Sequence, residues 1–263
     1  MSVPTGTAAK VGKPGLGKRV ALFATCINDA MMPAAPEATV RLLERLGCTV
    51  EFPRQQTCCG QILTNTGYFD EAVGTVKAYV GAFSDYDYIV GPSGSCVASV
   101  RHQHPMLARH SGDSGLEKAA TAAASRSYEL TEFLVDVLGV VDVGAYFPHR
   151  VTYHPSCHAT RMAKIGSRPY QLLEAVRGLE LVPLPHAEEC CGFGGTFSLK
   201  NPDISIAMAS DKARHVRSTE AEYLVAADNA CLLNIGGVLH RQFSGIKTIH
   251  LAEILAQTEQ DAA

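Results

Sequence analysis

The sequence carries little excess charge of either sign. Its 263 residues include 23 lysines and arginines and 26 aspartates and glutamates, mixed along the chain, for a formal net charge of −3. Proteins that bind nucleic acid or a membrane surface usually present a basic patch, so we expect neither kind of partner. No apolar run approaches the roughly 20 residues that a membrane-spanning helix needs, so no membrane span is expected.

Several patterns of common enzymes are also missing. No glycine-rich G-x-G-x-x-G or Walker pattern follows an expected strand, and neither a nucleophile elbow nor a paired-carboxylate pattern is present. The first eighteen residues contain three lysines among glycines and prolines but lack the apolar segment of a signal peptide. We therefore expect residues 1–18 to form a flexible tail and the protein to be cytoplasmic.

Cysteine is the residue that the sequence arranges most regularly. A lone cysteine precedes a Cys-Cys-Gly triplet by about thirty residues, another cysteine follows it, and the whole arrangement occurs twice, with matching positions 131 to 135 residues apart. The ninth cysteine, Cys48, has no counterpart, and we interpret it as a core residue. The eight repeated cysteines are Cys26, Cys58, Cys59 and Cys96 in the first copy and Cys157, Cys190, Cys191 and Cys231 in the second.

The sequence around the cysteines repeats as well. Residues 19–26 align with 150–157, residues 88–90 with 223–225, and residues 128–134 with 249–255. A repeated structural unit carries its hydrophobic pattern with it, whereas a chance repeat of cysteines would not. The sequence therefore predicts two modules, a first cysteine-rich domain over residues 19–140 and a second over residues 141–263.

Each module alternates expected strands with expected helices. This alternation predicts the α/β class, with two pseudo-symmetric Rossmann-like halves and parallel sheets, because parallel strands need helical crossovers. The cysteines come after the expected strands, at the carboxyl ends where open α/β sheets bind ligands. Strands are expected at 19–25, 48–52, 87–90, 151–153, 179–184 and 223–226, and helices at 37–46, 67–84, 129–138, 169–176 and 202–217.

Four thiolates that converge from separate loops repel one another unless a cation compensates them, so each quartet implies protonated thiols or a metal centre. Sulfur-only sites favour iron–sulfur clusters or zinc. Adjacent cysteines suit a polynuclear cluster better than tetrahedral zinc, whose ligands are usually two to four residues apart. Three alternatives stay open: a zinc-stabilised assembly module, a thiol–disulfide oxidoreductase that uses the adjacent cysteines, and buried inert thiols.

The double pattern resembles the CCG cysteine-rich domain, which is found twice in one of the proteins of heterodisulfide reductase and twice in the iron–sulfur protein of glycolate oxidase. The segments at 91–96 and 190–195 make the chain most similar to the lactate utilization protein A family. This resemblance implies an iron–sulfur electron-transfer subunit of a complex that oxidises L-lactate to pyruvate, rather than a complete enzyme. It implies partners, an iron–sulfur protein and a third subunit, and a [4Fe–4S] cluster, cubane or non-cubane, on the eight cysteines.

The chain departs from the fuller family pattern at two positions. That pattern ends in Cys-x-x-Cys, and Ser93 and Asp228 stand where its first cysteine would be. Their oxygens are candidate ligands, although sulfur is the preferred donor to iron. Two histidines, His154 and His158, bracket Cys157. Each is a candidate to donate to a thiolate or to carry a proton, with an ordinary loop histidine as the alternative.

Overall fold

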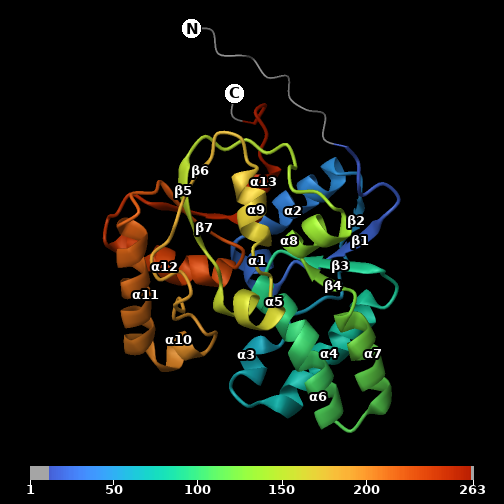
Figure 1. Ribbon diagram of the computed structural model, residues 1–263. Helices are drawn as coiled ribbons and strands as arrows, with labels where there is room; N and C mark the ends of the chain where they lie inside the picture. The colour runs from blue at the N-terminus through green and yellow to red at the C-terminus, as the bar shows by residue number, and fades with distance from the viewer. Residues whose placement is uncertain (1–11, 262–263) are drawn as a thin grey trace.

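Two four-stranded, entirely parallel sheets form the framework (Figure 1). In this computed structural model, which describes residues 12–261, the first sheet has the order β2-β1-β3-β4 and the second the matching order β6-β5-β7-β8. The predicted α/β class with two similar halves is thereby confirmed. The strands are β1 (Arg19–Leu22), β2 (Thr49–Glu51), β3 (Tyr88–Gly91), β4 (Ser127–Glu129), β5 (Arg150–His154), β6 (Glu180–Val182), β7 (Tyr223–Ala226) and β8 (Lys247–His250).

Helices connect the strands in both halves, and three of the segments, named η, are short π-helical turns. The first half contains α1 (Cys26–Met31), α2 (Ala34–Arg45), α3 (Gln61–Thr64), α4 (Phe69–Phe83), α5 (Gly94–Ala98), η1 (Ser99–Gln103), α6 (His104–His110), α7 (Ser114–Ala124), α8 (Leu130–Glu132) and η2 (Phe133–Val137). The second contains η3 (Ala159–Ala163), α9 (Arg168–Glu174), α10 (Phe197–Lys200), α11 (Pro202–Arg217), α12 (Asn229–Arg241) and α13 (Leu251–Ala256).

The strongly apolar elements lie where the sequence predicts them, and the fourth strand of each sheet is the main difference. β4 and β8 are short and contain polar residues, so neither shows the continuous apolar run of the inner strands. Each precedes a helix that begins with a reciprocal capping box, α8 at Glu129 and α13 at His250. The expected helix at 129–138 is therefore a strand end, a short helix and a π turn.

Of the tail expected at residues 1–18, residues 1–11 lie outside the described part of the chain. Over the next residues the chain makes a turn in which Gly15 is buried, and its N–H donates to the carbonyl of Leu46 at 2.9 Å. Cys48, next to this turn, is 6% exposed and belongs to the largest hydrophobic cluster, which confirms its interpretation as core. No helix within residues 12–261 combines the length and apolar character that crossing a membrane requires.

The two halves share one hydrophobic core. The largest buried cluster combines residues of both sheets, for example Val20 and Val90 with Val151 and Val225. Equivalent helices of the two halves pack reciprocally across this core: α13 of the second half packs on α2 of the first, and α8 of the first half packs on α9 of the second. Arg45 strengthens this contact, because its guanidinium donates to the carbonyls of Leu255 and Ala256, both at 2.6 Å.

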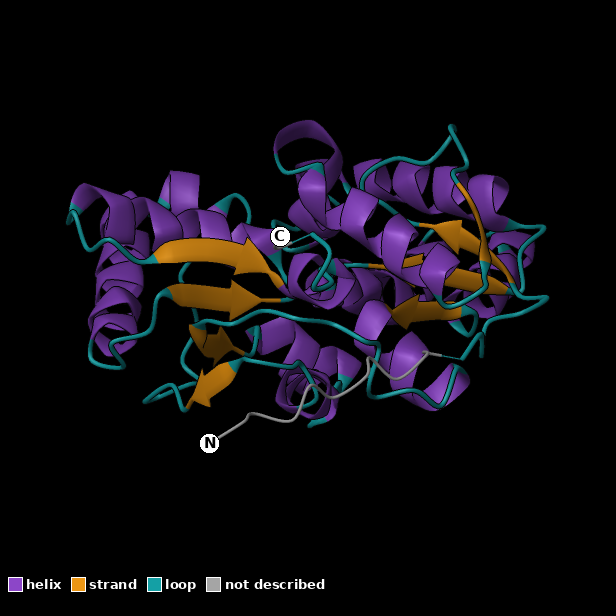
Figure 2. Cartoon of the chain, turned by 90° about the horizontal axis from the view of Figure 1, so that it is seen from above, coloured by secondary structure: helices purple, strands orange, loops and turns teal. Residues whose placement is uncertain are grey.

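The sheets lie at opposite sides of the molecule, and their longer strands point toward each other (Figure 2). The loops that follow the carboxyl ends of the strands therefore meet at the centre. Gly94 and Ala159 mark how closely the halves approach there, since a Cβ atom on Gly94 would lie 2.5 Å from the Cβ of Ala159. The topology thus places one loop region between the two halves.

Candidate metal centre

Matching positions in the two halves deliver the repeated cysteines. Cys26 and Cys157 follow β1 and β5, and Cys96 and Cys231 lie in the first turns of α5 and α12, after β3 and β7. The adjacent pairs lie in the loops after β2 and β6. Because all these strands are parallel, their carboxyl ends deliver the sulfur atoms to the same edge of each sheet.

All eight repeated cysteines line a single cavity between the halves. Its volume is about 810 Å³ with the open space at its mouth included. Cys59, Cys191 and Cys231 are buried, and the other five are partly exposed. The sequence predicts two quartets, and the structure brings both of them to one common space. Their role as ligands stays a prediction, whereas their convergence is an observation.

Within each quartet the sulfur atoms are close neighbours. Cys26 Sγ lies 3.5 Å from Cys58 Sγ, and Cys157 Sγ lies 3.9 Å from Cys190 Sγ. Through these contacts each pair shares a proton: the hydrogen bonds from Cys26 and Cys157 lower the pKa values of Cys58 and Cys190, while those of Cys26 and Cys157 themselves are raised. Each half therefore holds at least one thiol that readily becomes a thiolate ligand.

The buried pair of the second half is closer still. Cys191 Sγ donates to Cys231 Sγ at 3.1 Å, and this hydrogen bond, together with the neighbouring His154, lowers the pKa of Cys231 to about 6. Hydrogen bonds with Cys190 and with Cys231, together with burial, raise the pKa of Cys191. In the first half Cys59 likewise neighbours Cys58 and Cys96, and hydrogen bonds to both of them raise its pKa.

Glycine after each cysteine pair brings a backbone N–H to sulfur. The N–H groups of Gly60 and Gly192 donate to the sulfurs of Cys58 and Cys190, both at 3.4 Å. Both glycines have left-handed backbones, with φ of +78° and +83°, and a Cβ on Gly192 would lie 2.7 Å from the carbonyl oxygen of Ser205. Such N–H···S contacts stabilise charge on sulfur and tune the potential of a bound cluster.

The cavity lacks a side chain that would balance several thiolates. Among the described residues that line it, none is lysine or arginine, and His158 is the histidine among them. Its Nδ1 lies 3.5 Å from Cys157 Sγ. A bound cation would supply the missing compensation, and a set of eight sulfur donors would favour iron–sulfur clusters or zinc over harder ions. The residues present therefore fit a sulfur-ligated metal group.

Different residues hold the two paired-cysteine loops. Before Cys58, the side-chain amide of Gln56 donates to the carbonyl of Leu22 and accepts from the N–H of Ala24, at 3.0 and 2.9 Å. Before Cys190, the ammonium of buried Lys212 donates to the carbonyl of His186 at 2.5 Å. The repeat in the cysteines thus does not extend to the residues that support them.

Ser93 and Asp228, the two departures from the fuller family pattern, contact each other across the halves. Ser93 Oγ donates to Asp228 Oδ1 at 2.8 Å, and the hydroxyl and N–H of Ser95 donate to the same oxygen at 2.7 and 3.1 Å. Asn229 Nδ2 donates to Asn28 Oδ1 beside them, at 2.9 Å. The side-chain oxygens of Ser93 and Asp228, proposed from sequence as possible ligands, are thus engaged in joining the halves.

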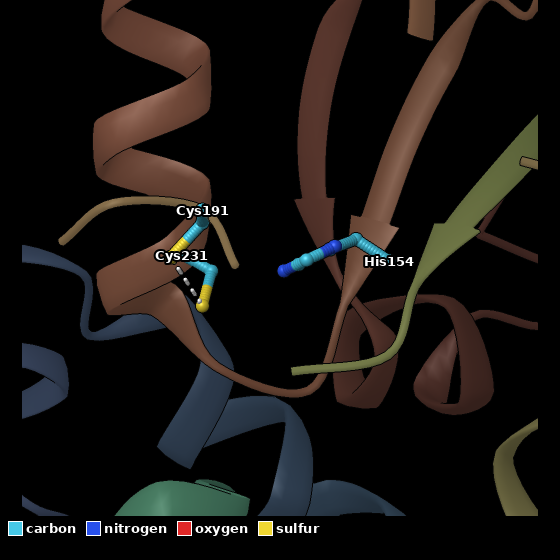
Figure 3. A group of neighbouring side chains, drawn as sticks. All are labelled: His154, Cys191 and Cys231. Atoms are coloured by element: carbon cyan, nitrogen blue, oxygen red, sulfur yellow. Dashed lines mark hydrogen bonds between the residues drawn. The ribbon is translucent and has the colours of Figure 1, made fainter. Parts of the chain in front are cut away.

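His154 is the residue whose position sequence reasoning did not resolve. It ends β5 with its side chain fully buried, and its ring points toward Cys191 and Cys231 (Figure 3). One ring nitrogen and the two sulfurs lie within 4.8 Å of one another. The repeat contained a signal for it, because His154 aligns with Phe23, so a polar side chain in the second half replaces an apolar one in the first.

Comparison with known proteins agrees with this geometry. Residues 20–101 and 151–236 each match the cysteine-rich domain family CCG. The matched segments carry the eight cysteines that line the cavity. Fold and site together define a protein with two CCG cysteine-rich domains.

Curated relatives narrow this class. The lactate utilization protein A of Oceanobacillus iheyensis is 49% identical over 237 residues, which cover 90% of this chain and 96% of that protein. Its counterpart in Geobacillus kaustophilus is 51% identical over 237 residues, covering 90% and 98%. That of Exiguobacterium sp. is 49% identical over 245 residues, covering 92% and 99%. The chain belongs to the lactate utilization protein A family.

A solved structure shares the fold at low sequence identity. A hypothetical protein from Helicobacter pylori superposes with a TM-score of 0.57 at 11% identity. The match covers 96% of this chain and 52% of that one, so this chain corresponds to about half of the Helicobacter protein. The similarity supports the arrangement of the two halves described above.

Proposed function

We propose that this protein is an iron–sulfur electron-transfer subunit of a complex that oxidises L-lactate to pyruvate. The observation that carries the proposal is the convergence of eight cysteines on one cavity that lacks a lysine or arginine among the described residues lining it. Family membership connects this site to lactate utilization. In this role the chain works in the cytoplasm with an iron–sulfur protein and a third subunit.

The chain's own residues hold the metal group and set its environment. The ligands are the eight cysteines, four from each half. A [4Fe–4S] cluster bound there supplies one-electron redox chemistry. Cys26 and Cys157 give up the protons that they share with their neighbours when the sulfurs become ligands. Gly60 and Gly192 donate N–H groups to sulfur, and the buried Ser93–Asp228 contact fixes the two loop regions relative to each other.

Two structural features favour electron transfer within a complex. Five of the eight cysteines are partly exposed, so the site lies near the surface where a partner docks. The core continues across the halves, and we propose that the domains over residues 19–140 and 141–263 act as one rigid unit. A rigid frame keeps bound groups at fixed separation while electrons pass between them.

The test is anaerobic purification of the full-length protein, followed by iron, zinc and acid-labile sulfide analysis. We expect brown protein with iron and sulfide in equal amounts and an EPR signal on reduction. Cys48→Ala serves as the matched control, because Cys48 lies in the core and outside the cavity. Colourless protein without iron or sulfide would refute the proposal.

A zinc-stabilised assembly module is the second candidate, and the trio of His154, Cys191 and Cys231 favours it, since mixed nitrogen and sulfur ligands are common in zinc sites. The same elemental analysis separates the two functions. Zinc without sulfide, with loss of folded structure on chelation, would establish the assembly role.

A further inference from the structure

We infer that His154 is a ligand of the metal group in the second half, so that the two cysteine sites are chemically different. The inference rests on the proposed function only for the identity of the metal group, since it concerns how the protein binds any metal there. It assigns five donors to the second site, one nitrogen and four sulfurs, and four sulfurs to the first.

The geometry places a nitrogen where a metal would need it. His154 is 0% exposed, and a ring nitrogen lies within 4.8 Å of the sulfurs of both Cys191 and Cys231, which are themselves 3.1 Å apart. Donor atoms around one metal ion lie about 3.5–4 Å apart, as follows from metal–sulfur and metal–nitrogen bonds of about 2.3 and 2.0 Å. A small adjustment, in which the two sulfurs separate and the ring nitrogen approaches them, therefore produces a bonding arrangement.

The polar contact of the His154 ring is with the site itself, because its approach to Cys231 helps to lower the pKa of that thiol. Although the side chain is completely buried, neither Nδ1 nor Nε2 makes a hydrogen bond of normal distance and angle within the described residues. A buried polar nitrogen without a hydrogen-bond partner destabilises the folded protein. A metal ion that accepts the lone pair of a His154 nitrogen would remove this penalty. Metal binding would therefore account for a buried histidine at the end of β5.

The first half shows what the position looks like without a nitrogen ligand. Phe23 occupies the matching place after β1, and its ring packs edge-on against Tyr79 and Phe83 at centroid distances of 5.1 and 5.7 Å. The buried histidine nearest to the first quartet, His104, uses Nε2 for a 2.8 Å hydrogen bond to the carbonyl of Cys59. Within residues 12–261 the first half provides no trio as close as that of His154.

The difference in ligands should give the two sites different redox properties. Because His154 adds a neutral imidazole beside the four thiolates, the two sites differ in their donor atoms, and ligand identity is one of the features that set the potential of an iron–sulfur centre. Two bound clusters would therefore differ in midpoint potential, which would give electron transfer between them a direction. Equal sites would give no such direction.

Pulsed EPR of the reduced, anaerobic full-length protein tests the ligand directly. In protein labelled with 15N-histidine we expect a strong nitrogen hyperfine coupling on one signal, and its loss in His154→Phe, which copies the first half. His154→Cys supplies a thiolate instead and should keep the iron, lose the coupling and lower the midpoint potential of that signal. His158→Phe is the matched control, because His158 is also next to Cys157, and it should keep the coupling.

A second measurement does not depend on iron. Metal-free protein labelled with 15N-histidine and loaded with 113Cd should show a 113Cd–15N coupling in the parent and in His158→Phe, and none in His154→Phe. Absence of iron and sulfide would refute the proposed function alone. Absence of nitrogen coupling in both the reduced and the cadmium-loaded parent, or its persistence in His154→Phe, would overturn the assignment of His154.

Discussion

Glu129 and His250 occupy equivalent places in the two halves and should make stability depend on pH in opposite directions. Each follows the last strand of its sheet and caps the next helix, and each is 1% exposed. The backbone N–H of Thr131 donates to Glu129 Oε2 at 2.7 Å, and that of Ala252 donates to His250 Nδ1 at 3.0 Å. Burial raises the pKa of Glu129 to about 7 and lowers that of His250 to about 4.

The size of the effect follows from these pKa values. In the unfolded chain Glu129 titrates near 4.5, so between pH 4.5 and 7 the folded state holds a proton that the unfolded state has released. Stability therefore falls as the pH rises through this window, by about 3 kcal/mol in total. Glu129→Gln keeps an acceptor for the N–H of Thr131 and removes the titration. Relative to the parent, it should gain roughly 2–3 kcal/mol more at pH 8 than at pH 5.

His250 provides the matched comparison with the opposite sign. Its folded pKa lies below the unfolded value of 6.5, so the parent loses stability as the pH falls from 6.5 to 4, by about 3 kcal/mol in total. His250→Gln should therefore gain stability over the parent at pH 4 and show no pH-dependent gain above pH 7. Urea unfolding of parent and variants at four pH values measures both effects. A gain for Glu129→Gln that is independent of pH, or larger at pH 5, would refute the burial argument.

Three further predictions concern the site and its supports. Asp228→Ala leaves the buried donors of Ser93 and Ser95 without their acceptor, so it should lower the free energy of unfolding by about 3–5 kcal/mol in urea titrations. Ser93→Ala should lower it by only about 1–2 kcal/mol. Equal losses in the two variants would contradict this account. Lys212→Met removes the hydrogen bonds that hold the loop before Cys190 and should lower the iron content by up to half in elemental analysis. A full iron content would show that the loop keeps its conformation without Lys212. Cys48→Ala should retain all iron and sulfide and lose about 1 kcal/mol of stability to a small cavity, measured by thermal unfolding; a fall in iron would place Cys48 in the site.

Sequence repetition was sufficient to predict the architecture because the signals are local. Apolar runs before Cys26 and Cys157 are enough to indicate buried parallel strands, and parallel strands place the following loops at one edge. β4 and β8 escaped prediction because their buried residues include Ser127, Glu129 and His250, whose burial depends on capping contacts rather than on apolar character.

The relation between the halves was beyond sequence reasoning. The spacing of the cysteines does not indicate that both quartets face one cavity, because the spacing within each module is independent of how the two modules pack together. The pairing of Ser93 with Asp228 joins positions 135 residues apart and becomes visible only when the halves meet. The sequence places His154 close to Cys157, but the approach of its ring to Cys191 and Cys231 depends on the loop after β6 and on α12.

The exchange of helices between the halves bears on how such a chain can arise. Because α13 covers α2 and α8 covers α9, a single module expressed by itself would expose to water the apolar face that its sister now occupies. Two identical copies of one module can cover each other's apolar faces in the same way, as a two-fold symmetric (isologous) dimer. The product of a gene encoding one module could therefore have worked as a homodimer before duplication and fusion, and fusion then freed the two cysteine quartets to diverge.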